Sequence, residues 1–154
     1  MATITAFLSG GTTGHPANKR TPYLVEGVVD FSLSTIADGD VIQVINVPAE
    51  TLILAAGMEV LTAVAGMTTP SFDLGYGTDQ DEWASNVDVT ATGYATPVGN
   101  GTAAHVAVLI TTADTIDIDT TDTSSGTATS GKIRVWAVLQ DVSGIRESAT
   151  GDQG

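Results

Sequence analysis

Short stretches of this sequence place apolar residues at every second position, and this pattern constrains the fold more than any other feature. In residues 115–120, Ile116 and Ile118 alternate with acidic or hydroxyl side chains. Residues 132–139 repeat the pattern with four apolar residues on one face, namely Ile133, Val135, Ala137 and Leu139. A period of two is the repeat of a half-buried β-strand, whereas an amphipathic helix repeats every 3.6 residues. The sequence therefore predicts strands at both places.

Three further stretches, at 23–34, 40–47 and 105–111, are typical of strands because β-branched residues are frequent in them. Pro48 ends the second of these stretches. Clusters of Gly, Asp, Asn and Pro separate the strands at short spacing, and no long helical pattern lies between them. A parallel α/β fold is excluded on this interpretation, because its crossovers need helices. We predict an all-β fold, an antiparallel β-sandwich.

Residues 50–67 are rich in Ala and Leu, so an amphipathic helix is the alternative to strands there. Gly57 lies in the middle of this run, where it would weaken a helix. Val60, Thr62 and Val64, three β-branched residues, also alternate along the chain. We therefore predict a strand at 51–55, a turn near Gly57 and a strand at about 58–65.

One helical turn is predicted at residues 79–84. Asp79 can cap its first turn, and Glu82, three residues later, can reach back to the capping amide. In such a turn Trp83 would anchor into the core.

The 154 residues suit one domain of ordinary size with two different ends. Residues 1–21 are predicted to form an extended N-terminal arm, because the Gly-rich polar run at 9–21 has no periodicity. Residues 22–146 would form the β-sandwich domain, and residues 147–154 a flexible tail.

The charge balance limits the partners. Five basic residues stand against 18 acidic ones, a net charge of −13, and such a chain should repel nucleic acid and anionic lipid. The longest apolar run, residues 51–67, is interrupted by Gly57 and Glu59 and is too short for a membrane span. We therefore predict neither nucleic acid nor a membrane as a partner.

No catalytic, metal or cofactor site is predicted. There is no cysteine, no Gly-x-Ser-x-Gly motif and no phosphate-binding glycine loop. Only His15 and His105 could act as an imidazole base or a zinc ligand, and two distant histidines make a weak zinc site. His15 precedes Pro16 in the arm, where we expect no pocket to hold it, and His105 opens a strand. We therefore expect that this protein is not an enzyme.

Two acidic clusters invite the question of calcium. Asp117 and Asp119 fit the first two positions of a calcium loop, but Thr121 replaces the third acid and Gly126 comes too late. We interpret these acids as solvated, outward-facing side chains on a strand, and the acids at 79–82 as capping residues. Calcium binding remains open at this point.

A sugar-binding sandwich is the alternative among binding functions, because exposed aromatic rings can stack on a sugar. Trp83 and Trp136 are the candidate aromatic residues. Trp136, inside an apolar strand, belongs to the core or to an interface.

Three runs resemble a pattern found in small virion proteins of tailed bacteriophages: VIQVINVPAETLILAAGMEV at 41–60, FDLGYGTDQDEW at 72–83 and GKIRVWAVLQD at 131–141. The similarity covers roughly residues 22–142. It implies a head decoration, or cement, protein with a jelly-roll-like sandwich that braces the capsid shell, and it transfers no catalytic residue. The resemblance also points to a homotrimer, which would match the threefold positions of an icosahedral shell.

These inferences predict a non-enzymatic structural protein on the capsid exterior of a phage virion, with the major capsid protein lattice as its partner. The alternative is a carbohydrate- or host-surface-binding module. In the arm, His15, Lys19 and Arg20 are the candidate residues for contact with the capsid or a sister subunit, because a cationic arm can reach an acidic neighbour. The predicted core comprises Ile42, Val44, Leu52, Leu54, Val60, Val108, Ile110, Ile133, Val135 and Ala137.

Overall fold

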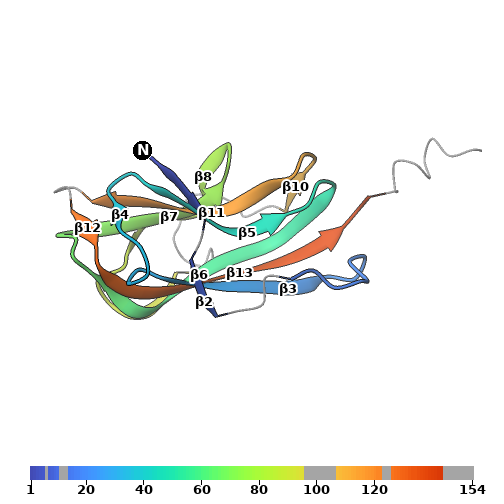
Figure 1. The fold of residues 1–154 in the computed structure, drawn as a ribbon. Coiled ribbons are helices and arrows are strands. Elements are labelled where there is room, and N and C mark those ends of the chain that lie inside the picture. The colour runs from blue at the N-terminus through green and yellow to red at the C-terminus, as the bar shows by residue number, and fades with distance from the viewer. Residues whose placement is uncertain (6, 11–13, 96–106, 123–125, 144–154) are drawn as a thin grey trace, which may run out of the picture.

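Two β-sheets packed face to face make up the fold (Figure 1). The computed structural model describes residues 1–5, 7–10, 14–95, 107–122 and 126–143. The first sheet contains, in spatial order, β1 (Thr3–Thr5), β5 (Val41–Val47), β11 (Asp114–Asp122), β7 (Pro70–Tyr76) and β8 (Asp79–Asp88). The second contains β10 (Val108–Ile110), β6 (Thr51–Ala65), β13 (Ser130–Asp141), β3 (Tyr23–Asp30) and β2 (Leu8–Gly10), and β9 (Gly93–Ala95) also pairs with β6. A small ribbon joins β4 (Ile36–Ala37) to β12 (Thr127–Ala128).

The predicted antiparallel β-sandwich is confirmed. Every described pairing is antiparallel except that of β1 with β5. The exclusion of a parallel α/β fold is confirmed, although β1 and β5 form one parallel pair. This pair needs no crossover helix, because the chain passes through β2 and β3 of the other sheet before it returns as β5.

The core lies between the sheets and follows the period-two pattern. Ile116 and Ile118 on β11 and the alternate residues of β13 are all buried. Phe31 and Phe72 join the two halves of the core, with ring centroids 5.7 Å apart. Most of the predicted core is confirmed as buried: Ile42, Val44, Val60, Ile110, Ile133, Val135 and Ala137.

Three members of the predicted core are misplaced. Leu54 is 38% exposed, and Leu52 and Val108 are only partly buried. The pairing of β6 with β13 shifts register between Val138 and Leu139, so that Leu54 is an extra residue in a bulge. Leu52 lies on the same outward side.

The turn predicted near Gly57 does not exist. Residues 51–65 form one continuous strand, β6, which also excludes the alternative helix. Gly57 lies opposite Trp136 of β13, and a Cβ at position 57 would lie 2.6 Å from the Trp136 Cζ2 atom. The glycine therefore makes room for an indole ring and not for a turn.

The helical turn predicted at 79–84 is also wrong. These residues belong to strand β8, which pairs with β7 through a two-residue turn at Gly77 and Thr78. Tertiary pairing outweighs the local capping pattern here. The expectation that Trp83 anchors into the core is confirmed, since its side chain is buried.

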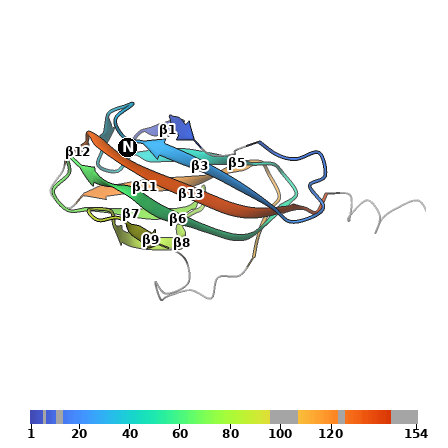
Figure 2. The same cartoon turned by 90° about the horizontal axis from the view of Figure 1, so that it is seen from below.

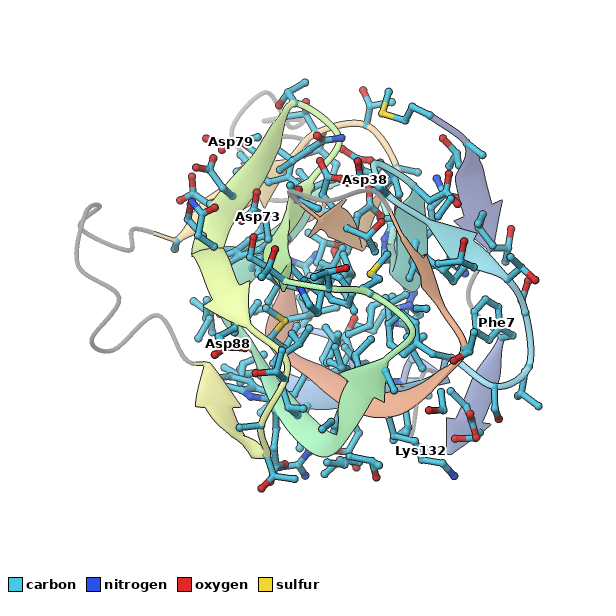
Figure 3. All side chains as sticks on the ribbon, turned by 90° about the vertical axis from the view of Figure 1, so that its left-hand side faces the viewer. Phe7, Asp38, Asp73, Asp79, Asp88 and Lys132 are labelled. Atoms are coloured by element: carbon cyan, nitrogen blue, oxygen red, sulfur yellow. The ribbon has the colours of Figure 1, made fainter. Side chains whose placement is uncertain are left out.

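The N-terminal residues join both sheets. β1 extends the first sheet beside β5, and β2 extends the second sheet beside β3. Phe7, between them, packs partly buried against the core and lies between the two strands in Figure 3. This segment, part of the predicted arm, therefore closes one side of the sandwich. No helix in the described part of the chain is long and apolar enough to cross a membrane.

Candidate functional site

The part of the arm that holds the predicted contact residues lies against the sandwich. The His15 Nδ1 atom is 2.8 Å from the Tyr23 hydroxyl, and its Nε2 atom is 3.1 Å from the Asn46 carbonyl oxygen. The ring also meets Tyr23 edge-on, at 5.7 Å between centroids. The expectation that no pocket holds His15 is thus wrong, because this ring is clamped between β3 and β5. His105 lies outside the described residues.

His15 lines an open hollow of about 510 Å³ together with Gln43, Asn46, Pro48, Asp114 and Thr115. The lining offers one carboxylate, one imidazole and neutral polar groups.

Lys19 and Arg20 are held by their backbone at the end of β13. The Asp141 amide donates to the Lys19 carbonyl at 2.7 Å, and Gln140 Nε2 donates to the Arg20 carbonyl at 2.8 Å. Hydrogen bonds from Ser143 and the nearby charges of Arg20 and Lys19 lower the pKa of Asp141. The two cations therefore lie at one end of the second sheet. Nothing in the structure tests their contact with a capsid, which stays a prediction.

The two sheets differ sharply in charge. The strands of the first sheet contain nine acidic residues and no basic one, whereas those of the second contain four acidic and two basic residues. Figure 3 shows Asp38, Asp73 and Asp79 toward one side of the molecule and Lys132 toward the opposite side. The sandwich thus has an acidic side and a nearly neutral side.

Burial and neighbouring charges raise the pKa of two carboxylates of the first sheet. Desolvation and the charge of Asp81 raise the pKa of Asp73, although a hydrogen bond from the Asn86 amide opposes them. Desolvation and the charges of Asp73 and Asp38 raise the pKa of Asp119. This side of the molecule would therefore resist further loss of water.

Asp117 departs from the predicted solvated acid. It faces outward from β11 but is only 5% exposed, and its Oδ1 atom has no hydrogen-bond partner. Asp117 on β11 pairs with Gly75 on β7. The backbone of Asp79 and Gln80 lies against Gly75, so the start of β8 covers the Asp117 side chain. Burial, with the charges of Asp114 and Asp119, raises the pKa of Asp117 to about 6, while a hydrogen bond with Thr115 opposes the shift.

The acidic residues that the structure describes do not assemble a metal centre. Within the described ranges, no group of three or more His, Asp or Glu side chains could hold a metal ion. Asp73 and Asp119 lie opposite each other on β7 and β11, but calcium requires six to eight converging oxygen atoms.

The outer surface of the second sheet is apolar. Leu24 and Leu109 are 56% and 43% exposed, far more than is usual for leucine in a strand. Leu24 pairs with Val138 on β13, and Leu109 pairs with Leu52 on β6, so these side chains share the outward surface. We call this surface the apolar face and define it by Leu24, Leu52, Leu54, Leu109, Trp136 and Val138. Figure 2 views the sheet from this side.

The charged side chains beside the apolar face are paired with one another. Arg134 Nη2 lies 2.6 Å from Glu59 Oε2, and Arg134 Nη1 lies 3.4 Å from Glu26 Oε2. Lys132 Nζ lies 3.1 Å from Asp30 Oδ2. These ion pairs join three neighbouring strands and combine two basic with three acidic side chains, so this part of the surface is much less acidic than the first sheet.

Sequence analysis missed the apolar face for a specific reason. A mostly apolar strand such as β6 gives no sign of which side points outward, and the bulge at Leu54 shifts the alternation. The useful signal was in β13, where Lys132, Arg134, Trp136 and Val138 share the side opposite the core. Trp136 is partly buried on this outer side, which supports an interface more than the core.

No protein-family model matches this sequence, and no curated protein matches it. Solved structures of phage capsids do share its fold. A chain in the capsid of Ralstonia phage GP4 superposes with a TM-score of 0.62 at 15% identity, covering 90% of this chain and 97% of that one. A chain of the cyanophage Pam1 capsid gives a TM-score of 0.56 at 18% identity, over 83% of this chain and 89% of that one. A chain in the acid-stable capsid of Helicobacter pylori bacteriophage KHP30 gives 0.51 at 12% identity, over 77% and 86%.

Proposed function

We propose that this chain is a non-enzymatic structural protein of a phage virion that decorates and stabilises the outside of the capsid shell. The observation that carries the proposal is the shared fold: chains of three phage capsids match most of this sandwich. The resemblance of residues 22–142 to head decoration proteins supports the finer assignment. The acidic first sheet supports an external position, because it would repel packaged DNA.

In this proposal the partner is the lattice of the major capsid protein, and the chain acts as a homotrimer at threefold positions. Several linked copies would bind neighbouring lattice sites together and so gain avidity. His15, Lys19 and Arg20 are the proposed contact residues of the arm. Arg20 is exposed, so its side chain is available to a neighbour.

Interrupting the gene for this chain in its phage distinguishes a decoration protein from a major capsid protein, which the shell needs in order to form. Without a decoration protein, capsids should assemble but break at lower temperature, and added purified protein should restore their stability. A cryo-electron microscopy reconstruction of the intact particle should show the chain outside the shell in hundreds of copies. Failure of capsids to form, or absence of the chain from the shell, would contradict the proposal.

One observation favours a second candidate, a carbohydrate- or host-surface-binding module. Trp136 lies over Gly57 on the outer surface with the polar groups of Arg134 and Glu26 beside it, and sugar sites combine these features. Glycan binding that is lost in Trp136→Ala, together with only a few copies per particle, would support this candidate.

A further inference from the structure

We propose that the apolar face is the surface by which this chain docks on the capsid shell, and that the partner presents an apolar protein surface to it. This inference rests on the proposed function and deepens it, because it assigns the contact to one side of one sheet. The face combines exposed leucines from β3, β6 and β10 with a tryptophan and a valine from β13.

The distribution of charge selects this side. A two-layer sandwich that lies flat on a capsid contacts the capsid through the outer surface of either the first or the second sheet. Covering the first sheet would remove water from a row of carboxylates on β7, β8 and β11, two of which already have a pKa raised by burial and by neighbouring charges, with no basic residue in those strands to pair with them. Covering the second sheet would bury leucines, and five of its six charged side chains are already in ion pairs within the chain.

The apolar face also has the anatomy of a protein interface. Its centre holds Val138, between Leu24 of β3 and Ala55 of β6. Trp136, a residue type that often dominates binding energy, lies at its border, where it pairs with Glu26 and Gly57. Gly57 lets the indole settle toward the sheet instead of projecting from it, which keeps the surface flat. Gln140 binds the Arg20 carbonyl at the end of β13, so the two arm cations lie at the rim.

Two leucines of equal exposure make a matched test. Leu24 on the apolar face is 56% exposed, and Leu33, in the turn after β3, is 58% exposed. Leu24→Glu and Leu33→Glu add the same charge at sites that the core does not use, so both variants should keep the melting temperature of the wild type. Binding is measured by co-sedimentation of each purified protein with capsids from the phage whose gene for this chain is interrupted.

Leu24→Glu should bind these capsids about tenfold more weakly or worse, because the docked state would bury an unpaired carboxylate. Leu33→Glu should bind like the wild type. Equal binding by all three proteins would overturn the docking surface while leaving the proposed function intact. If the wild type itself fails to bind, the proposed function falls and this inference with it.

Sedimentation velocity of the free proteins tests whether a second copy of this chain, and not the capsid, covers the apolar face. If Leu24→Glu converts a wild-type oligomer to monomers, the apolar face joins copies of this chain and the proposal is wrong. An unchanged oligomeric state together with weakened capsid binding supports it.

Discussion

Asp117 is a buried carboxylate on a sheet that is already acidic, and its environment makes a specific prediction about pH. Its pKa is raised to about 6 from an ordinary value of 3.8. A carboxyl group whose pKa is raised by folding contributes stability below its unfolded pKa and loses that contribution as the pH rises through its folded pKa. The ionised form therefore destabilises the protein at neutral pH and above.

Asp117→Asn should consequently raise the free energy of unfolding by about 1–2 kcal/mol at pH 8 and have little effect near pH 4. Urea titrations at both pH values measure the difference. Asp88→Asn is the control, because hydrogen bonds from Thr90 lower the pKa of that exposed carboxyl group and predict no stabilisation at pH 8. An Asp117→Asn gain that is the same at pH 4 and pH 8 would contradict the raised pKa.

Gly57 and Trp136 form a second pair in which one residue depends on the other. A Cβ at position 57 would lie 2.6–3.0 Å from three atoms of the indole, too close for the ring to stay where it is. Gly57→Ala should therefore lower the free energy of unfolding by about 1–3 kcal/mol. In a Trp136→Ala background the same change should cost much less, because the clash is gone. Additive losses in this double-mutant cycle would show that the two residues do not compete for one space.

At the scale of the strand, neighbouring residues of β6 allow a test of which side faces the core. Ile53 is fully buried and Leu54 is 38% exposed. Ile53→Ala should destabilise the protein by about 2–5 kcal/mol, and Leu54→Ala by about 1 kcal/mol or less. Thermal and urea unfolding of both variants measures these losses. Equal losses would mean that the bulge at Leu54 does not turn that side chain outward.

The same strand shows how far the sequence could predict the structure. Strict alternation, as at Ile116 and Ile118, predicted both the strand and its buried side. In β6 the pairing with β13 shifts register at three places, one of them the bulge at Leu54, so no single alternation runs along the strand. The role of Gly57 depends on Trp136, 79 positions later in the chain, so no local pattern could reveal it. The turn signal at 57 failed because pairing with the distant strand β13 decides that place, and the helix signal at 79–84 failed because the hairpin with β7 decides that one.

The N-terminal strands illustrate the same limit and lead to another prediction. β1 and β2 contain three residues each, too few for a recognisable period, yet they extend both sheets and place Phe7 against the core. Phe7→Ser should lower the melting temperature while leaving the β-rich circular dichroism spectrum intact, because one edge of the core loses its cover. Thr5→Ser, an exposed change in β1, is the control. A Phe7→Ser variant that melts like the wild type would show that this segment does not close the sandwich.

For the whole molecule, the candidate surface was harder to predict than the fold. Composition revealed a net charge of −13 but not how the charges divide between the two sheets. That division appears only in the assembled structure, where β7, β8 and β11 bring their acidic residues into one sheet and β3, β6 and β13 bring the ion pairs into the other. His15, Lys19 and Arg20 were found by their charge and chain position. Their attachment to Tyr23, Asn46 and the end of β13 required the structure.

The apolar face and the two arm cations at its rim lie at different places, and we predict that they affect different rate constants of capsid binding. The cations should affect association, and the apolar face should affect dissociation. Rim charges steer encounter over a range set by salt, about 10 Å at 0.1 M and 3 Å at 1 M, whereas buried apolar contacts set the rate of dissociation. Lys19→Gln with Arg20→Gln should therefore slow association with capsids at low salt and leave dissociation nearly unchanged, and this defect should vanish at 1 M salt. Leu24→Glu should speed dissociation at every salt concentration. Surface plasmon resonance on immobilised capsids measures both rates. If the two arm substitutions instead accelerate dissociation at all salt concentrations, the arm is a latch in its own right and not the rim of the apolar face.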